Sequence, residues 1–158
     1  MDAFARELEA LYAARYVSFR NALATVTGSR DSARDAVQEA FARALAGREG
    51  RRANACLAAW VWKIAYRVAL EQRREDRSRS PGEPEAELLE PERDPELAAA
   101  LRRLPPRRRL IVFLRYFGDF SYAEIAEACD VSEGTVAAAL AQARAELRAA
   151  LVLEGAVR

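Results

Sequence analysis

Aromatic and cationic side chains alternate in one stretch of this sequence, residues 60–74. Flat rings come from Trp60, Trp62 and Tyr66, and between and after them lie Lys63, Arg67, Arg73 and Arg74. Rings can stack on the bases of a single nucleic-acid strand while the cations contact its phosphates, so this pattern is typical of single-strand binding. A buried aromatic core with a solvated rim of arginines would show the same pattern. The stretch by itself leaves both interpretations open.

A second stretch, residues 120–151, is patterned as two helices joined by a tight turn. Ser121 and Glu124 form a capping-box pattern. Asp130 falls at the turn, where aspartate tolerates left-handed backbone. Ser132 can cap the second helix, whose apolar stripe follows spacings of three and four: Val136, Leu140, Ala143, Leu147 and Leu151. The pattern predicts either a DNA-binding helix-turn-helix or an ordinary helical hairpin.

Three amino-terminal helices are expected to position the aromatic-basic stretch. The first spans about residues 2–26 and stops at Gly28. The second spans about residues 32–46, with Ser32 at its start and Gly47 after its end. One side of this second helix is polar and is made of Asp35, Gln38, Glu39 and Arg43. A basic loop then carries Arg48, Arg51, Arg52 and Asn54 into a third helix at about residues 55–75.

The remaining sequence divides into a linker and a second helical region. Residues 76–95 contain four prolines and a run of glutamates, which indicates a flexible acidic linker. Short helices are then expected at residues 97–103 and from Pro105-Pro106 to Gly118. The second of these is apolar around much of its circumference, Phe113 and Phe117 included, and could offer a face to a partner. The predicted fold class is therefore all-α, with small helical domains at residues 1–75 and 96–158.

Composition limits the possible functions. The chain has 158 residues with 25 basic and 24 acidic side chains, and all of the basic residues except Lys63 are arginine. The net charge therefore does not indicate a nucleic-acid partner, but two basic segments flank the acidic linker. Two cysteines and no histidine exclude the usual zinc frameworks and histidine acid–base chemistry, so we expect no metal, no cofactor and no catalysis. The absence of a signal peptide and of a membrane-length apolar run predicts a cytoplasmic protein without membrane insertion.

Two sets of motifs occur one after the other along the chain, and their order and separation are those of a known family. The first is DSARDAVQEAFARAL followed by AWVWKIAYRVALEQRR, and the second is LPPRRRLIVFLRYFGDFSYAEIAEACDVSEGTVAAALAQARAEL. Together they resemble the two conserved regions, region 2 and region 4, of bacterial sigma factors of the extracytoplasmic-function (group IV) class. The resemblance covers about residues 4–75 and 96–150, and it favours the nucleic-acid interpretation of the aromatic-basic stretch.

The resemblance implies roles for the amino-terminal residues. The polar side made of Asp35, Gln38, Glu39 and Arg43 would dock on the clamp helices of RNA polymerase core. The loop and third helix would melt and read the minus-ten promoter element as a single strand. The residues expected there are Arg48, Arg51, Arg52, Asn54, Trp60, Trp62, Lys63, Tyr66, Arg67, Glu71, Arg73 and Arg74. Many relatives have Arg-Asn, and an Asp four residues after that Asn, where this chain has Tyr66-Arg67 and Glu71, so its minus-ten preference is expected to differ.

The resemblance also implies roles for the carboxy-terminal residues. Phe113 and Phe117 would hold the polymerase flap, and the helix after Ser132 would read the minus-thirty-five element. The residues expected there are Ser132, Glu133, Thr135, Ala138, Gln142, Arg144 and Arg148. Three cations customary in the family have become Ala137, Ala139 and Gln142, which predicts weakened phosphate contact.

The sequence therefore predicts a sigma factor that recruits RNA polymerase core to promoters and is held inactive by an anti-sigma protein. One alternative is a helix-turn-helix regulator acting without polymerase, which would need a dimer interface and a basic recognition helix. The other is a protein-interaction module that has lost strong DNA binding, as the alanine-rich helix would allow.

Overall fold

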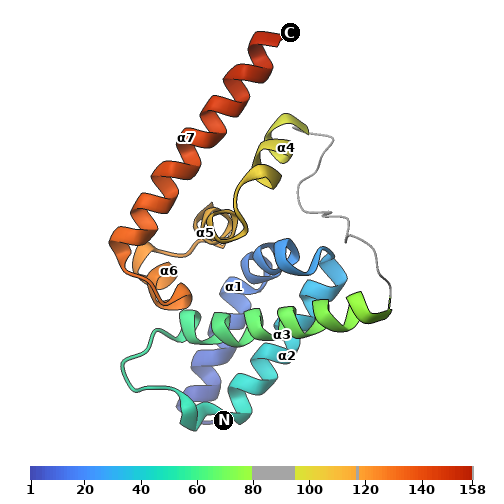
Figure 1. Ribbon diagram of the computed structural model, residues 1–158. Helices are drawn as coiled ribbons and strands as arrows, with labels where there is room; N and C mark the ends of the chain where they lie inside the picture. The colour runs from blue at the N-terminus through green and yellow to red at the C-terminus, as the bar shows by residue number, and fades with distance from the viewer. Residues whose placement is uncertain (80–94, 117, 158) are drawn as a thin grey trace.

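The computed structural model describes residues 1–79, 95–116 and 118–157, and all the regular elements in these ranges are helices. Helices α1 (Ala3–Thr27), α2 (Arg30–Ala46) and α3 (Leu57–Arg79) pack against one another as a three-helix bundle (Figure 1). A short turn of 3-10 helix, η1 (Arg48–Gly50), lies in the loop between α2 and α3. We call residues 1–79 the amino-terminal unit.

The helix ends of this unit follow from local chemistry, and two predicted positions are wrong. Gly28 ends α1 in the left-handed conformation, φ 78°, as the sequence predicts. The cap of α2 is Ser29 and not Ser32, because the Ser29 hydroxyl accepts a hydrogen bond from the Ser32 amide at 3.2 Å. Helix α3 continues four residues beyond its predicted end, because no glycine or proline interrupts the chain before Pro81.

The carboxy-terminal unit contains α4 (Pro95–Arg103), α5 (Pro106–Tyr116), α6 (Tyr122–Cys129) and α7 (Glu133–Val157). The first three of these helices all pack against α7, whose far end extends beyond the rest of the molecule (Figure 1). Of the predicted linker, Pro95 already belongs to α4 and residues 80–94 lie outside the described residues.

The turn between α6 and α7 has the predicted helix-turn-helix chemistry. Both hydrogen bonds of the capping box are present, with Ser121 accepting from the Glu124 amide and the Glu124 carboxylate accepting from the Ser121 amide. Asp130 adopts the left-handed conformation at φ 55°, as predicted. The Ser132 hydroxyl accepts from the Thr135 amide at 3.1 Å and so caps α7. Val136, Leu140 and Ala143 are fully buried along the predicted stripe.

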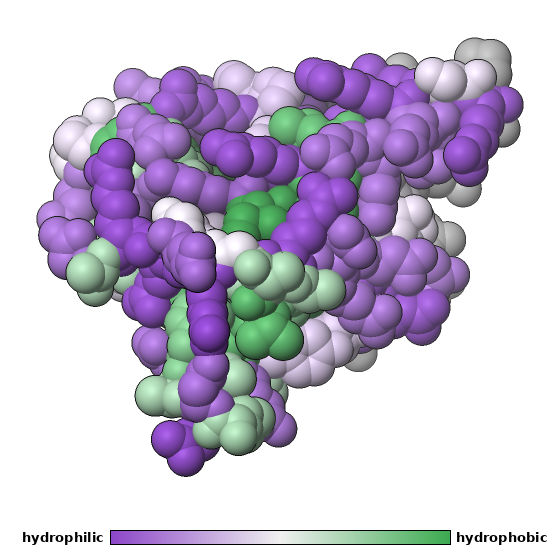
Figure 2. Space-filling model, turned by 90° about the horizontal axis from the view of Figure 1, so that it is seen from below, coloured by the Kyte–Doolittle hydropathy of each residue, from purple (hydrophilic) through white to green (hydrophobic). Residues whose placement is uncertain are grey.

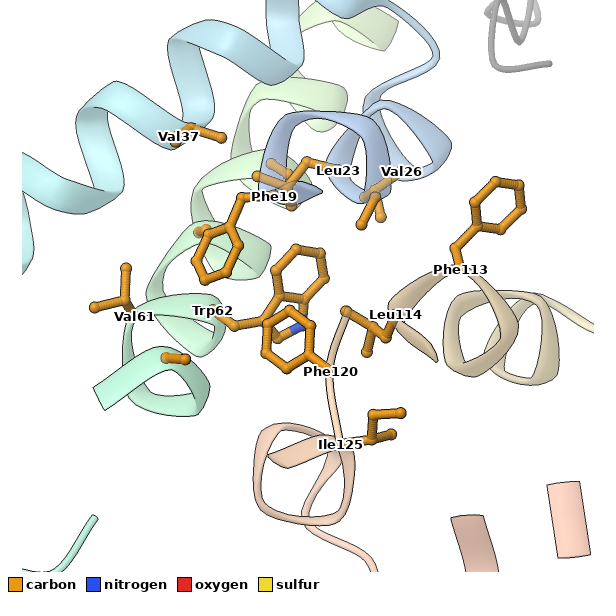
Figure 3. Packing of buried hydrophobic residues seen from close by; sticks show 14 of the residues in the cluster. Phe19, Leu23, Val26, Val37, Val61, Trp62, Phe113, Leu114, Phe120 and Ile125 are labelled. Atoms are coloured by element: carbon orange, nitrogen blue, oxygen red, sulfur yellow. The ribbon is translucent and has the colours of Figure 1, made fainter. Parts of the chain in front are cut away.

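The two units share one hydrophobic core. Phe19 of α1 and Trp62 of α3 meet Phe120, which precedes α6, and all three rings are almost completely buried (Figure 3). Helix α3 packs against α6, and α1 packs against α5. The fold therefore presses the helix-turn-helix against the aromatic-basic helix.

The surface of the molecule is mainly hydrophilic on the face shown in Figure 2, where hydrophobic areas are small. Large exposed apolar side chains among the described residues lie on different helices, and they include Val17, Leu45 and Val152. None of the described helices combines the length and the apolar character that crossing a bilayer requires.

Candidate nucleic-acid interface

A cleft of about 520 Å³ separates α3 from the first turn of α5 and the end of α6. Five cations line it: Lys63, Arg67, Arg73, Arg107 and Arg109. Tyr66 adds a partly exposed ring, and Asp130 is the one acid among the described residues of the lining. A cleft with this excess of positive charge and an aromatic wall suits a polyanion that carries flat rings, such as a nucleic-acid strand.

Burial affects one of these cations directly. Arg73 is partly buried, and its pKa is lowered first by this desolvation and then by the nearby charges of Arg77 and Arg109. Its buried Nε has no hydrogen-bond partner among the described residues. An arginine stays charged under such a shift, so this group presents uncompensated positive charge.

Trp62 does not lie where the predicted role requires it. Its side chain is 1% exposed and packs edge-on against both Phe19 and Phe120, with ring centroids 5.6 and 5.8 Å away. In this arrangement the ring cannot stack on a base, so the prediction of Trp62 as a DNA contact is wrong for the described structure. Trp60 is partly exposed beside Phe4 and keeps a surface that a base could reach.

The basic loop before α3 is partly engaged with α1. Arg48 pairs with Asp2, and Arg51 pairs with Glu7 at 3.5 Å while donating to the Ala55 carbonyl at 2.8 Å. The exposed side chains in this loop include Arg52 and Asn54, and Arg67 and Arg74 are exposed on α3. These exposed groups are the ones that a DNA strand could reach without breaking an existing contact.

The polar face predicted on α2 is exposed as a set. Asp35, Gln38, Glu39 and Arg43 all point to solvent, while the opposite face of the helix, including Val37 and Phe41, is buried. Arg43 holds Glu39 at 2.8 Å and reaches across to Glu71 of α3 at 3.3 Å. Its pKa is raised, chiefly by the hydrogen bond to Glu39. Glu71, predicted as a DNA contact, is thus tied to this face.

The hydrophobic side chains of the apolar helix α5 are buried in the core of the protein. Phe113 is 3% exposed, and Ile111, Val112 and Leu114 are buried with it. The prediction that Phe113 is available to a partner is therefore wrong for this arrangement, because the ring belongs to the core. Phe117, predicted beside it, lies outside the described residues.

The second helix of the helix-turn-helix presents a mixed surface. Ser132, Glu133, Thr135, Ala138 and Arg148 are exposed. Gln142 and Arg144 are also exposed, but each is held by α5: Gln142 accepts from Arg108 at 2.9 Å, and Arg144 donates to the Tyr116 hydroxyl at 2.8 Å. Hydrogen bonds to Tyr122 and Tyr116 raise the pKa of Arg144. The cationic part of this surface is therefore already partly engaged.

Sequence reasoning missed the groups that join the two units. Arg15, Phe120 and Glu127 all lie at this contact, and none was a predicted site residue. Arg107 and Arg109 were also missed, although the run LPPRRR at a helix start is a visible signal of clustered charge.

Comparison with known proteins places the chain among relatives of one kind. Residues 95–147 match the family model described as Sigma-70, region 4. The chain is 32% identical over 132 residues to RNA polymerase sigma factor SigV of Bacillus subtilis (strain 168), which covers 80% of each protein. It is 31% identical over 151 residues to ECF RNA polymerase sigma factor EcfG of Rhodopseudomonas palustris (strain TIE-1), covering 88% of this chain and 82% of the relative.

Solved structures with the same fold agree with these relatives. The sigma factor RpoE from Bartonella quintana, in complex with the anti-sigma factor NepR, superimposes with a TM-score of 0.67 at 21% identity over 96% of this chain and 98% of its own. CnrH, solved in complex with the cytosolic domain of CnrY, gives a TM-score of 0.68 at 22% identity over 94% of this chain and 89% of its own. At these identities the two structures support the all-α two-unit fold alone.

Proposed function

This chain belongs to the extracytoplasmic-function class of RNA polymerase sigma factors, and we propose that its two units divide the tasks of such a subunit between them. A sigma factor directs RNA polymerase core to specific promoters and promotes DNA melting when transcription begins. The relatives are not enzymes, and we assign the chain no catalytic step. Its role is to recognise polymerase and promoter DNA, and each of these contacts must be made by a particular surface of the protein.

The amino-terminal unit, residues 1–79, would dock on the polymerase and open the minus-ten element. The observation that carries this proposal is the placement of two different surfaces on one rigid bundle. The polar face of α2 offers Asp35, Gln38 and Glu39 to a protein partner, whereas α3 and the basic loop offer exposed cations and rings. Because α2 packs against α3, and Arg43 and Glu71 meet between them at 3.3 Å, docking and melting would be held in a fixed relation.

The residues that we propose as nucleic-acid contacts are those whose side chains are exposed to solvent. Arg52, Asn54 and Arg67 are exposed and Trp60 is partly exposed, so a single strand can reach them. Stacking of one base on an aromatic side chain contributes about 1–3 kcal/mol, and the nearby cations add phosphate contacts. Trp62 is left out of this set because its ring is buried.

The carboxy-terminal unit, residues 95–157, would read the minus-thirty-five element through the first turns of α7. Exposed Thr135 and Ala138 can contact base edges and thymine methyl groups. Gln142 and Arg144 are already bonded to α5, so this reading should be weak by itself. Weak reading is sufficient where polymerase and the amino-terminal unit share the binding, because linked sites raise the effective concentration.

The partners we propose are RNA polymerase core, promoter DNA and an anti-sigma protein, and the place of action is the cytoplasm, where polymerase works. The solved structures that share this fold contain a sigma factor with NepR and CnrH with CnrY, which supports the third partner. The proposal of a regulator acting without polymerase is less well supported, since the cations of its recognition helix are partly engaged with α5.

Run-off transcription tests the function. Purified protein, core polymerase and genomic promoter fragments should give discrete transcripts that core alone does not give. Stable core binding without any initiation would instead favour the protein-interaction module.

A further inference from the structure

The cleft of about 520 Å³ beside α3 carries more positive charge than its own side chains neutralise. Between described residues, the one ion pair in its lining joins the Lys63 ammonium to the Asp130 carboxylate at 2.7 Å. The other four cations of the lining have no carboxylate partner among the described residues: Arg67, Arg73, Arg107 and Arg109. The cleft is therefore suited to an anion that carries several charges.

Two arginines of the cleft, Arg73 on α3 and Arg109 on α5, are close enough to oppose each other's charge. Desolvation by burial is the largest cause that lowers the pKa of Arg73, and the charges of Arg77 and Arg109 lower it further. The Nε of Arg73 is buried without a hydrogen-bond partner in the described part of the chain. Like charges and an unsatisfied buried donor both cost stability, and an anion between the two guanidinium groups would remove both costs.

The amino end of α5 adds partial positive charge at the same place. Pro106 and Arg107, the first two residues of this helix, both line the cleft. Phosphate groups bind well at helix amino ends, because the amides of the first turn lack partners within the helix and the helix dipole is positive there. The side chains and the backbone of α5 therefore favour the same kind of ligand group.

An aromatic wall faces these charges. The ring of Tyr66 is partly exposed in the cleft and lies against Trp62, with ring centroids 6.5 Å apart and planes 31° apart. Because Trp62 is almost completely buried, it holds the Tyr66 ring in place, and a flat base could stack on that ring. The volume of the cleft also falls within the range of small-ligand sites, about 300–1,000 Å³.

We propose that this cleft binds a nucleoside polyphosphate, with the phosphates on Arg73, Arg107 and Arg109 and the base on Tyr66. These four residues lie outside the set that we propose as DNA contacts, and binding requires neither polymerase nor promoter, so the inference goes beyond the proposed function. Arg67 belongs to both sites, since it also lines the cleft. A bound nucleotide would therefore compete with the DNA strand for Arg67, and this consequence alone rests on the proposed function.

Isothermal titration calorimetry of the full chain with GTP tests the phosphate part of the site. One GTP should bind per chain, and GMP, which has fewer phosphate charges, should bind at least about tenfold more weakly. Arg73→Gln and Arg109→Gln should each weaken GTP binding at least about fivefold, because each removes a charged contact. The matched control is Arg34→Gln, an exposed arginine of α2 outside the cleft, which should leave the affinity unchanged. Circular dichroism checks that every variant keeps its helices.

Inorganic triphosphate and Tyr66→Leu test the nucleoside part. The leucine keeps an apolar side chain but removes the ring, so GTP binding should weaken at least about fivefold while the binding of inorganic triphosphate stays unchanged. Equal affinity of the native protein for GTP and for inorganic triphosphate would overturn recognition of the nucleoside.

Three further outcomes would overturn the site itself. They are no binding of GTP, unchanged GTP affinity in both Arg73→Gln and Arg109→Gln, and an equal loss in Arg34→Gln, which would indicate a nonspecific charge effect. A single-stranded oligonucleotide whose binding depends on Arg109, with no binding of GTP, would assign the cleft to DNA instead. Failure of run-off transcription would overturn the proposed function, and the GTP affinities would still decide this site.

Discussion

Arg43 of α2 reaches Glu71 of α3 at 3.3 Å while it holds Glu39 of its own helix at 2.8 Å. This relationship joins the surface proposed to dock on polymerase to the helix proposed to melt DNA. The three side chains are about half exposed, so the contact adds little stability. The orientation of the two surfaces is fixed by the packing of α2 against α3, and the ion pair marks the place where their edges meet.

Glu39→Lys should weaken binding to core polymerase. The substitution reverses the charge of an exposed carboxylate at the centre of the α2 face, and it also places a cation beside Arg43. We expect Kd to rise at least about tenfold, or ~1.4 kcal/mol, as measured by fluorescence anisotropy with labelled protein. Glu9→Lys makes the same charge change at an exposed position of α1 and should leave Kd unchanged. Equal binding by all three proteins would remove Glu39 from the docking surface.

The two tryptophans should respond differently to replacement by alanine. Trp62→Ala removes a buried ring and should lower the free energy of unfolding by about 3–5 kcal/mol, measured by urea denaturation. Trp60→Ala should cost less stability, because that ring is partly exposed, but it should reduce the permanganate reactivity of minus-ten thymines. Normal promoter melting by Trp60→Ala at full stability would contradict the proposed single-strand contact.

Ala137→Lys should strengthen binding of the carboxy-terminal unit to duplex promoter DNA. The position is exposed near the start of α7, where the family customarily has a cation, and a new phosphate contact should steepen the salt dependence by about 0.9. Titrations at several salt concentrations measure the slope. Ala149→Lys adds the same charge at an exposed position farther along α7 and should have a smaller effect. A steeper slope in both variants alike would indicate a nonspecific charge effect.

Cys129 should make stability depend on pH in the alkaline range. Burial is the largest cause that raises the pKa of its thiol above the ordinary value of 9.0. The unfolded chain therefore ionises first, and the stabilising contribution is present below about pH 9 and is lost as pH rises through the folded-state pKa. Thermal unfolding of the native protein and of Cys129→Ser should show a smaller alkaline loss in the variant. Identical pH profiles would mean that this thiol titrates normally.

Much of the fold could be predicted because its signals are local. Caps such as Ser121 and stops such as Gly28 act within one helical turn, and the apolar stripe of α7 repeats at three and four residues. Even the errors were local, as when Ser29 rather than Ser32 capped α2. The polar face of α2 is exposed as its sequence predicts, because helical periodicity separates it from the buried side.

The contact between the units could not be predicted in the same way. Phe120 lies in a short connection without periodicity, and its partners Phe19 and Trp62 are distant in the chain. The aromatic-basic pattern is compatible with Trp62 either in the hydrophobic core or in contact with DNA. Only the position of the carboxy-terminal unit shows that the ring is buried. The burial of Phe113 could not be predicted for the same reason. The sequence of a helix that is apolar on most sides does not show which side its neighbours will cover.

The fastening of Gly118 and Phe120 by Arg15 has a consequence for gene expression. A protein whose binding-competent form is only a fraction of the total shows an affinity for promoter DNA reduced by that fraction. One arginine on α1, which donates to the Gly118 carbonyl and lies over the Phe120 ring, would therefore influence how much promoter DNA the protein binds at a given abundance.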